Sequence, residues 1–200
     1  MNEIEKLIFN IDIPSDKPAS GKILVSEPFL REEYFRHAVV ALFDHSDGGS
    51  SMGAVLNRQT TIALQNLLPD IETENPIPVF CGGPMSCDRL FFIHALGDII
   101  SDSKQLTESL WIGGDFGQIT EYVNAGYPLE GYVRFILGYS GWSAGQLEEE
   151  IDNRVWAVTS PDSPARILTG SDDSYWHHYV RRLGNRYRGW RFHPANPSAN

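Results

Sequence analysis

The stretch that decides the fold is residues 21–57, GKILVSEPFLREEYFRHAVVALFDHSDGGSSMGAVLN. Apolar runs at residues 23–26, 38–44 and 52–56 alternate with segments rich in glycine, proline or charge, a pattern typical of short β-strands joined by turns. Similar runs follow at residues 79–81, 90–96, 110–112 and 133–139. The sequence therefore predicts more strands than helices.

Helical patterns are fewer, and they fall at residues 61–68, 117–124, 144–153 and 174–183. The last of these is expected to stop at Gly184, with Trp176 and Val180 on its apolar face and His177 largely outside. Helices interspersed irregularly among strands predict an α+β domain with a mainly antiparallel or mixed sheet.

The length of 200 residues, with 42% hydrophobic residues, suits one domain with a full core. We expect an N-terminal arm at residues 1–20, a domain at residues 21–184 and a basic, aromatic tail at residues 185–200. No apolar run is long enough to cross a bilayer, and the acidic N-terminal segment does not resemble a signal peptide. Two cysteines cannot build a disulfide framework, so the sequence predicts a cytoplasmic protein without a membrane partner.

Two later blocks complete a pattern with residues 21–57. They are FCGGP at residues 80–84 and FILGYSGWSAGQLEEE at residues 135–150. Together the three blocks resemble the bacterial YqgE/AlgH family. The resemblance implies a sheet folded into a pseudo-barrel flanked by helices, and it implies no settled activity, only a link to gene regulation in one branch of the family.

Asp44, His45 and Asp47 lie where an apolar strand meets a glycine-rich turn. A histidine between carboxylates can act as a general base near neutral pH, so one hypothesis is a small hydrolase or transferase that uses His45 with Asp44 or Asp47. The alternative is that His45 bonds the hairpin backbone while Asp47 and the glycines shape the turn. Since His45 matches the histidine of the family pattern, both interpretations stay open.

The paired glycines Gly82 and Gly83 follow a predicted strand. Successive backbone N–H groups at such a turn can form an anion cradle, with Arg89 close by, or the glycines can simply permit a tight turn. The candidate ligand-binding residues are His45, Asn57, Arg58, Gly82, Gly83 and Arg89. No nucleotide-binding motif is present, and Cys81 and Cys87 lack zinc-knuckle spacing, so the sequence predicts no cofactor and no metal.

The charge is uneven along the chain. Residues 175–200 hold five arginines and no acid, which gives this segment a charge of about +5. Since the net charge of the whole chain is −10, residues 1–174 carry about −15. The candidate nucleic-acid residues are Arg181, Arg186, Arg188 and Arg191. The alternative is that Tyr187, Trp190 and Phe192 lie as an extended segment on the acidic body, with the arginines beside them.

Our first hypothesis is therefore a non-catalytic binding or regulatory module whose partner is a protein or a small molecule. An enzyme acting through His45 is the second hypothesis, and nucleic-acid binding through the C-terminal strip is possible but not favoured. The oligomeric state stays open.

Overall fold

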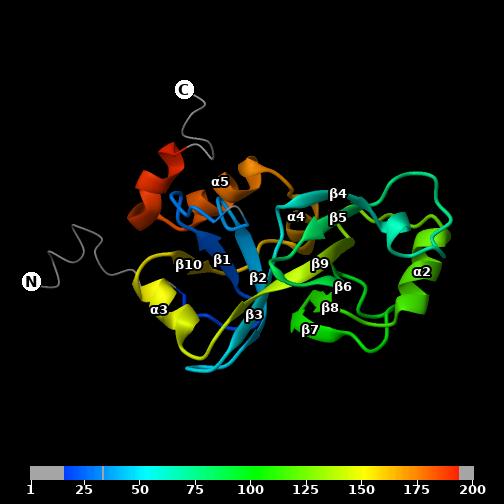
Figure 1. The fold of residues 1–200 in the computed structure, drawn as a ribbon, viewed down its shortest axis with the longest axis horizontal. Coiled ribbons are helices and arrows are strands. Elements are labelled where there is room, and N and C mark those ends of the chain that lie inside the picture. Colours follow the sequence, from blue (N-terminus) through cyan, green and yellow to red (C-terminus); the bar gives the residue numbers. More distant parts are fainter. Residues whose placement is uncertain (1–15, 33, 194–200) are drawn as a thin grey trace, which may run out of the picture.

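The computed structural model describes residues 16–32 and 34–193 (Figure 1). In this part of the chain ten strands form one sheet, in the order β10-β1-β2-β3-β9-β6-β8-β7, with β5 joined to β9 and β4 joined to β5. The strands are β1 (Ile23–Ser26), β2 (Val39–His45), β3 (Ser51–Val55), β4 (Gln59–Ala63), β5 (Pro78–Cys81), β6 (Met85–His94), β7 (Lys104–Thr107), β8 (Leu110–Ile112), β9 (Val133–Trp142) and β10 (Trp156–Thr159).

All strand pairs are antiparallel except β5 with β9, which is parallel. The sheet curls into a half-barrel, and helices flank it (Figure 1). The predicted α+β class and the mainly antiparallel, curled sheet are confirmed.

The described α-helices are α2 (Phe116–Asn124), α3 (Gln146–Asp152), α4 (Pro164–Thr169) and α5 (Asp173–Arg182), and the 3₁₀ helices are η1 (Leu64–Asn66) and η2 (Asn185–Phe192). Helices α3 and α2 lie toward opposite ends of the long axis, while α4 and α5 lie on the side away from the β2–β3 turn (Figure 1). The helix predicted at residues 61–68 is wrong, because β4 pairs with β5 and leaves only one 3₁₀ turn at this place.

Apolar residues of the strands and helices build three buried clusters. The largest one packs α5, through Trp176 and Val180, against Val25 and Val39 of the first two strands. A second cluster places α2 against β6 and β9, and a third places α3 beside β2 and β10. Helix α5 thus lies over the strands that begin the domain.

Strands β2 and β3 form a hairpin with two distinct ends. At one end His45 pairs with Ser51, and at the other Val40 pairs with Val55. We call residues 44–51 the hairpin tip and residues 37–39 with residues 55–58 the hairpin base. The base faces α4 and α5, whereas the tip points away from them (Figure 1).

The C-terminal strip does not lie extended as predicted. Gly184 has φ +80°, and hydrogen bonds of the turn type fold residues 185–192 into η2, which packs against α5. Tyr187 is buried and Trp190 is half-buried, but Phe192 is 74% exposed. The prediction that all three aromatic side chains pack on the body of the protein is therefore wrong for Phe192. Most of the predicted N-terminal arm and residues 194–200 of the predicted tail lie outside the described residues.

Among the described residues, no helix has both the length and the apolar character needed to cross a membrane.

Candidate functional site

His45 is held at the hairpin tip by its neighbours. Its Nδ1 lies 2.8 Å from Ser51 Oγ, and its Nε2 lies 4.0 Å from Glu148 Oε1 of α3, with 7% of the side chain exposed. Asp44 instead pairs with Lys104 at 3.1 Å, and Asp47 is exposed in the turn. In the described structure, the carboxylate that pairs with His45 is therefore Glu148 and neither of the predicted aspartates.

The Gly82-Gly83 turn is built into the sheet. The Gly82 N–H donates to Leu137 O at 2.9 Å, and the Gly82 carbonyl accepts from Ser140 Oγ at 2.9 Å. A Cβ at Gly82 would lie 2.2 Å from Gly138 O, and Gly83 has φ +148°. The geometry favours a close-packed turn over an anion cradle, because the Gly82 amide is already committed to the sheet.

Asn57 and Arg58 lie at the hairpin base. Asn57 is 2% exposed; its Oδ1 accepts from Val39 N–H at 2.9 Å, and its Nδ2 donates to His37 O at 2.8 Å. The Arg58 carbonyl accepts from Cys81 N–H at 2.7 Å, which brings the base close to the glycine turn. The His45 turn lies at the other end of the hairpin, so the candidate ligand-binding residues do not all gather at the hairpin base.

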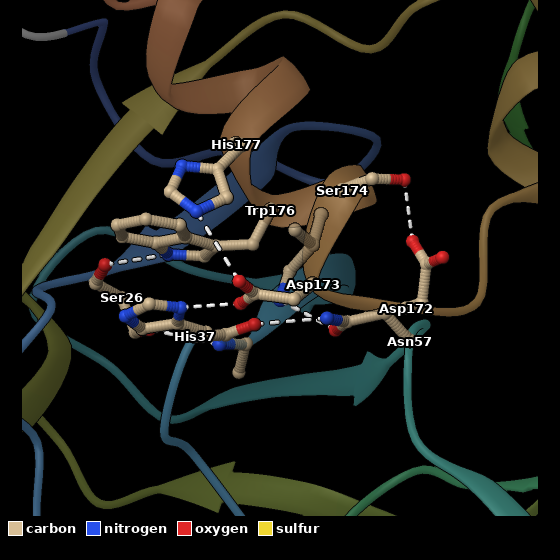
Figure 2. A network of polar contacts seen from close by, with 10 residues as sticks. Ser26, His37, Asn57, Asp172, Asp173, Ser174, Trp176 and His177 are labelled. Carbon is tan, nitrogen blue, oxygen red and sulfur yellow. Dashed lines mark hydrogen bonds and ion pairs between the residues drawn. The ribbon is translucent and has the colours of Figure 1, made fainter. Parts of the chain in front are cut away.

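A polar cluster that the sequence analysis did not single out lies between the hairpin base and α5 (Figure 2). The Asp173 carboxylate bridges two histidines: Oδ1 contacts His37 Nδ1, and Oδ2 lies 3.2 Å from His177 Nε2. The indole of Trp176 stacks on His37, with ring centroids 3.8 Å apart and planes 10° apart. Figure 2 shows the two imidazoles pointing at the same carboxylate from different elements.

His37 is fully buried and has φ +50°, a left-handed conformation that is uncommon for a residue with a side chain. Burial lowers the pKa of His37, which favours the neutral ring, while Asp173 opposes this shift. Its Nε2 is buried without a hydrogen-bond partner. Strained backbone and unpartnered buried polar atoms concentrate at functional sites, so this cluster is a candidate site.

One sequence signal for the cluster was available. Asp173 directly precedes the helix predicted at residues 174–183, and in the observed helix α5 it stands four residues before His177, which places the two side chains on one face. The expectation that His177 lies largely outside is only partly met, because its side chain is 23% exposed. His37 lies 136 residues before Asp173, and no spacing rule connects them.

A separate cavity of about 730 Å³ contains no residue of the hairpin base in its lining. Its lining comes from the β4 and β5 region, the C-terminal end of α2, β9, and the segment between α4 and α5. Arg134 of β9 lines the cavity, is 2% exposed, and donates from Nη1 to Leu56 O. Its guanidinium carbon lies 4.1 Å from the centre of the Phe80 ring.

Arg134 carries an uncompensated charge. No carboxylate in the described part of the chain forms an ion pair with it, and its Nε is buried without a partner. Burial lowers the pKa of Arg134 to about 10, so the group stays protonated at neutral pH. The ionisable neighbours that favour its charged form are Tyr175 and Tyr179, and burial raises the pKa of both phenols, which are therefore neutral at pH 7.

The arginines of the C-terminal strip do not share one surface role. Arg191 Nη2 donates to Arg181 O at 3.0 Å, so these two residues are tied to each other. Arg188 is exposed, and the side chain of Arg186 lies outside the described structure. Arg89, the other candidate cation, is exposed on β6 at the edge of a separate hollow.

Together the features define an α+β domain built on a half-barrel sheet, with buried His37 and Asn57 at the hairpin base and buried Arg134 on β9. Residues 23–188 match the protein-family model described as AlgH-like, and the chain belongs to this family. The resemblance expected from the sequence is confirmed.

Relatives and solved structures agree with this assignment. A "UPF0301 protein" from Parabacteroides distasonis is 42% identical over 196 residues, covering 98% of each chain, and one from Bacteroides thetaiotaomicron is 36% identical, covering 98% of this chain and 99% of that one. The crystal structure of a Corynebacterium diphtheriae protein has a TM-score of 0.72 at 22% identity, covering 92% of this chain and 96% of that one. The solution structure of the AlgH protein from Pseudomonas aeruginosa has a TM-score of 0.66 at 25% identity, covering 86% and 94%.

Proposed function

We propose that this protein is a non-catalytic binding module whose ligand is a small organic anion, held in the cavity by Arg134. The observation that carries the proposal is a buried guanidinium that faces a cavity and has no anionic partner in the described structure. The proposal places the module in the cytoplasm, where Cys81 and Cys87, both free thiols, would stay reduced.

The free energy of burying a charge supports an anionic ligand. An ion removed from water costs several kcal/mol unless a partner compensates it. Arg134 has one carbonyl partner and one aromatic face, and these compensate only part of that cost. A carboxylate or phosphate can accept two parallel N–H bonds from a guanidinium and would supply the missing charge.

The size and walls of the cavity define the rest of the ligand. A volume of about 730 Å³ lies within the range of small-molecule sites. The wall mixes polar and apolar side chains with the apolar ones in slight excess, including Phe80, Val133 and Leu168, so we expect an apolar part attached to the anionic group. Glu130 also lines the cavity, and its charge disfavours a ligand with many negative groups.

The same lining argues against catalysis at this place. Among the described residues of the wall there is no histidine or cysteine, and Glu130 and Arg134 are its charged members. General acid–base catalysis most often uses a histidine, and the described wall offers none. His45, the candidate base of the enzyme hypothesis, is at the hairpin tip and does not line the cavity.

The test is a thermal-shift comparison of three proteins: the natural chain, Arg134→Met and Arg89→Met. The probes are benzoate, acetate and inorganic phosphate as sodium salts, each against sodium chloride of equal ionic strength. We expect benzoate to raise the melting temperature of the natural chain and of Arg89→Met but not of Arg134→Met. A ligand at a hundredfold excess over its Kd stabilises the folded state by about 2.7 kcal/mol.

Arg89→Met is the matched control, because Arg89 is an exposed arginine outside the cavity. An equal shift in all three proteins would place the binding elsewhere. A shift lost in Arg89→Met and kept in Arg134→Met would reverse the assignment and favour the surface predicted from the sequence.

A further inference from the structure

We propose that His37, Asp173 and His177 form a binding site for one divalent transition-metal ion of the Zn²⁺ type. One nitrogen of each imidazole and one oxygen of the carboxylate lie within 4.8 Å of one another. Ligands of a tetrahedral zinc ion stand about 2.0 to 2.2 Å from the metal, so their mutual separations are about 3.5 Å. Since His37 is fixed, binding requires the partly exposed Asp173 and His177 side chains to adjust to that spacing.

The three ligands are held by the fold before any ion binds. His37 is fully buried beneath the Trp176 indole, and its carbonyl accepts from Asn57 Nδ2, so both its ring and its backbone are fixed. Asp173 and His177 stand one turn apart on α5 (Figure 2). Preorganised ligands lower the entropy cost of binding an ion.

One side of the cluster is open to solvent. The Asp173 side chain is 42% exposed and that of His177 is 23% exposed, whereas that of His37 is 1% exposed. An ion can therefore enter from the Asp173 side, and a water molecule there would complete a tetrahedron. Three protein ligands with one open position are the arrangement of zinc sites that bind or activate a further molecule.

The chemistry of the ligands selects the class of metal. Two imidazoles and one carboxylate suit Zn²⁺ and its transition-metal neighbours, whereas Mg²⁺ and Ca²⁺ prefer oxygen ligands only. The sequence predicted no metal because Cys81 and Cys87 lack zinc-knuckle spacing, whereas His37 lies 136 residues before Asp173 and only the fold brings the two together.

A neighbouring pair on the same helix provides a control. His178 Nε2 lies 2.8 Å from Asp162 Oδ2, which is also 3.1 Å from Arg182 Nη1. This pair has an imidazole and a carboxylate, as the proposed site does, but an arginine takes the place of a second imidazole. Changes at this pair on addition of zinc therefore measure the background binding of zinc to a histidine–aspartate pair without a second histidine.

The experiment titrates Zn²⁺ into the full chain, freed of any affinity tag and treated with a chelator, and measures the heat of binding. Four proteins are compared: the natural chain, Asp173→Asn, His177→Gln and His178→Gln. We expect one ion per chain, and an affinity that falls at least about tenfold in Asp173→Asn and His177→Gln, since even outer partners of a metal contribute that much. His178→Gln should bind as the natural chain does, and Mg²⁺ should not compete.

A second measurement separates binding from folding. His177 is partly exposed, so His177→Gln should keep the circular dichroism and melting temperature of the metal-free natural chain. Co²⁺ should give the visible absorption of a tetrahedral site in the natural chain and lose it in His177→Gln. Equal zinc affinity in His177→Gln, a loss in His178→Gln instead, or no measurable binding to the natural chain would overturn the proposal.

Discussion

The two ends of the β2–β3 hairpin each hold a histidine, and the two histidines are used differently. At the tip, His45 contacts Ser51 across the turn and approaches Glu148 of the adjoining helix. At the base, His37 meets Asp173 and Trp176, which come from the far end of the chain. The tip is a turn with a distant partner in Glu148 of α3, whereas at the base the histidine is fully buried and stacks on Trp176 of α5.

The two ends also differ in how their buried polar atoms are satisfied. Two nitrogens at or next to the base have no partner: His37 Nε2, and Nε of Arg134, whose Nη1 donates to Leu56 O. The tip has one such atom, Glu148 Oε2, but the other oxygen of that carboxylate accepts from Gly48 N–H at 3.0 Å. Unsatisfied buried groups destabilise a fold, and Tyr179 Oη and Arg191 Nε are two more in the described structure. We propose a function at the base because Arg134 also lines a cavity and His37 also contacts Asp173.

The largest loss of stability is expected at the Gly82-Gly83 turn, which we interpret as a structural element and not as a binding site. Gly82→Val should lower the free energy of unfolding by about 3 kcal/mol or more, near the top of the range for one substitution, because the new Cβ would meet backbone atoms that cannot move. Urea unfolding measures it, with Gly189→Val as control, since a Cβ at Gly189 would meet nothing within 4 Å. A folded, stable Gly82→Val protein with a binding defect alone would move function to this turn.

The next effect concerns the tail that supports α5 at the base. Removing residues 185–200 should cost about 3 kcal/mol, because buried Tyr187 and half-buried Trp190 are lost from the core. Phe192→Ala, at an exposed position, should change stability by less than about 0.5 kcal/mol.

The alternative function of the tail is nucleic-acid binding. It is tested by measuring how the natural chain and an Arg181/Arg188/Arg191→Ala variant bind RNA and DNA at two salt concentrations. The packing account predicts no tight binding in the natural chain to lose. If the truncated protein melts like the parent while the arginine variant loses salt-sensitive binding, the packing account is wrong.

A direct comparison of the two hairpin ends comes from one polar substitution at each. Asn57→Ala should cost about 2 kcal/mol, because it leaves the buried Val39 N–H and His37 carbonyl unpaired at the base. Ser51→Ala at the tip should cost about 1 kcal/mol or less, because it removes one side-chain contact to His45. Equal costs in chemical denaturation would remove the energetic distinction between the two ends.

The smallest expected effect uses a third buried histidine, His94, as a reference for burial without a carboxylate. Burial lowers the pKa of His94, and its Nδ1 accepts from Leu96 N–H at 3.1 Å, so the folded state prefers the neutral ring. The unfolded chain therefore takes up a proton first as the pH falls through 6.5, and stability present above this pH is lost below it.

Urea midpoints of the natural chain and His94→Gln between about pH 7.5 and 5.5 test this. The natural chain should lose stability toward the acid end, and the variant should show a flatter profile. Parallel profiles would show that burial of His94 does not control the acid side of stability.

Much of the fold could be predicted because its signals are local. The strand at residues 23–26 and the helix at residues 117–124 were predicted nearly to the residue from apolar periodicity and flanking turns. Strand β4 was missed because its sequence, QTTIA, is mostly polar and exposed, and it exists by pairing with β5. Tertiary pairing of this kind overrides local propensity.

The candidate site was less predictable for the same reason. His45 was predicted as a site residue because aspartates and glycines surround it in sequence, yet its contacts are Ser51 across the turn and Glu148 of α3. Arg134 could have been predicted from the sequence, because it is the one charged residue of the apolar run VRFILGY. A strand that is buried on both faces disfavours an unpaired charge, so a charged residue in such a run indicates a special role. His37 gave no such signal, since only the fold brings α5 to it.

The most direct test of the central claim is the free energy of unfolding of Arg134→Met against the natural chain, measured in urea without added organic anion. If Arg134 is an uncompensated buried charge, its replacement by an apolar side chain of similar length should leave stability within about 1 kcal/mol or increase it. A loss of about 3 kcal/mol or more would show that the guanidinium is already compensated within the fold, which would contradict the account of an anion site at Arg134.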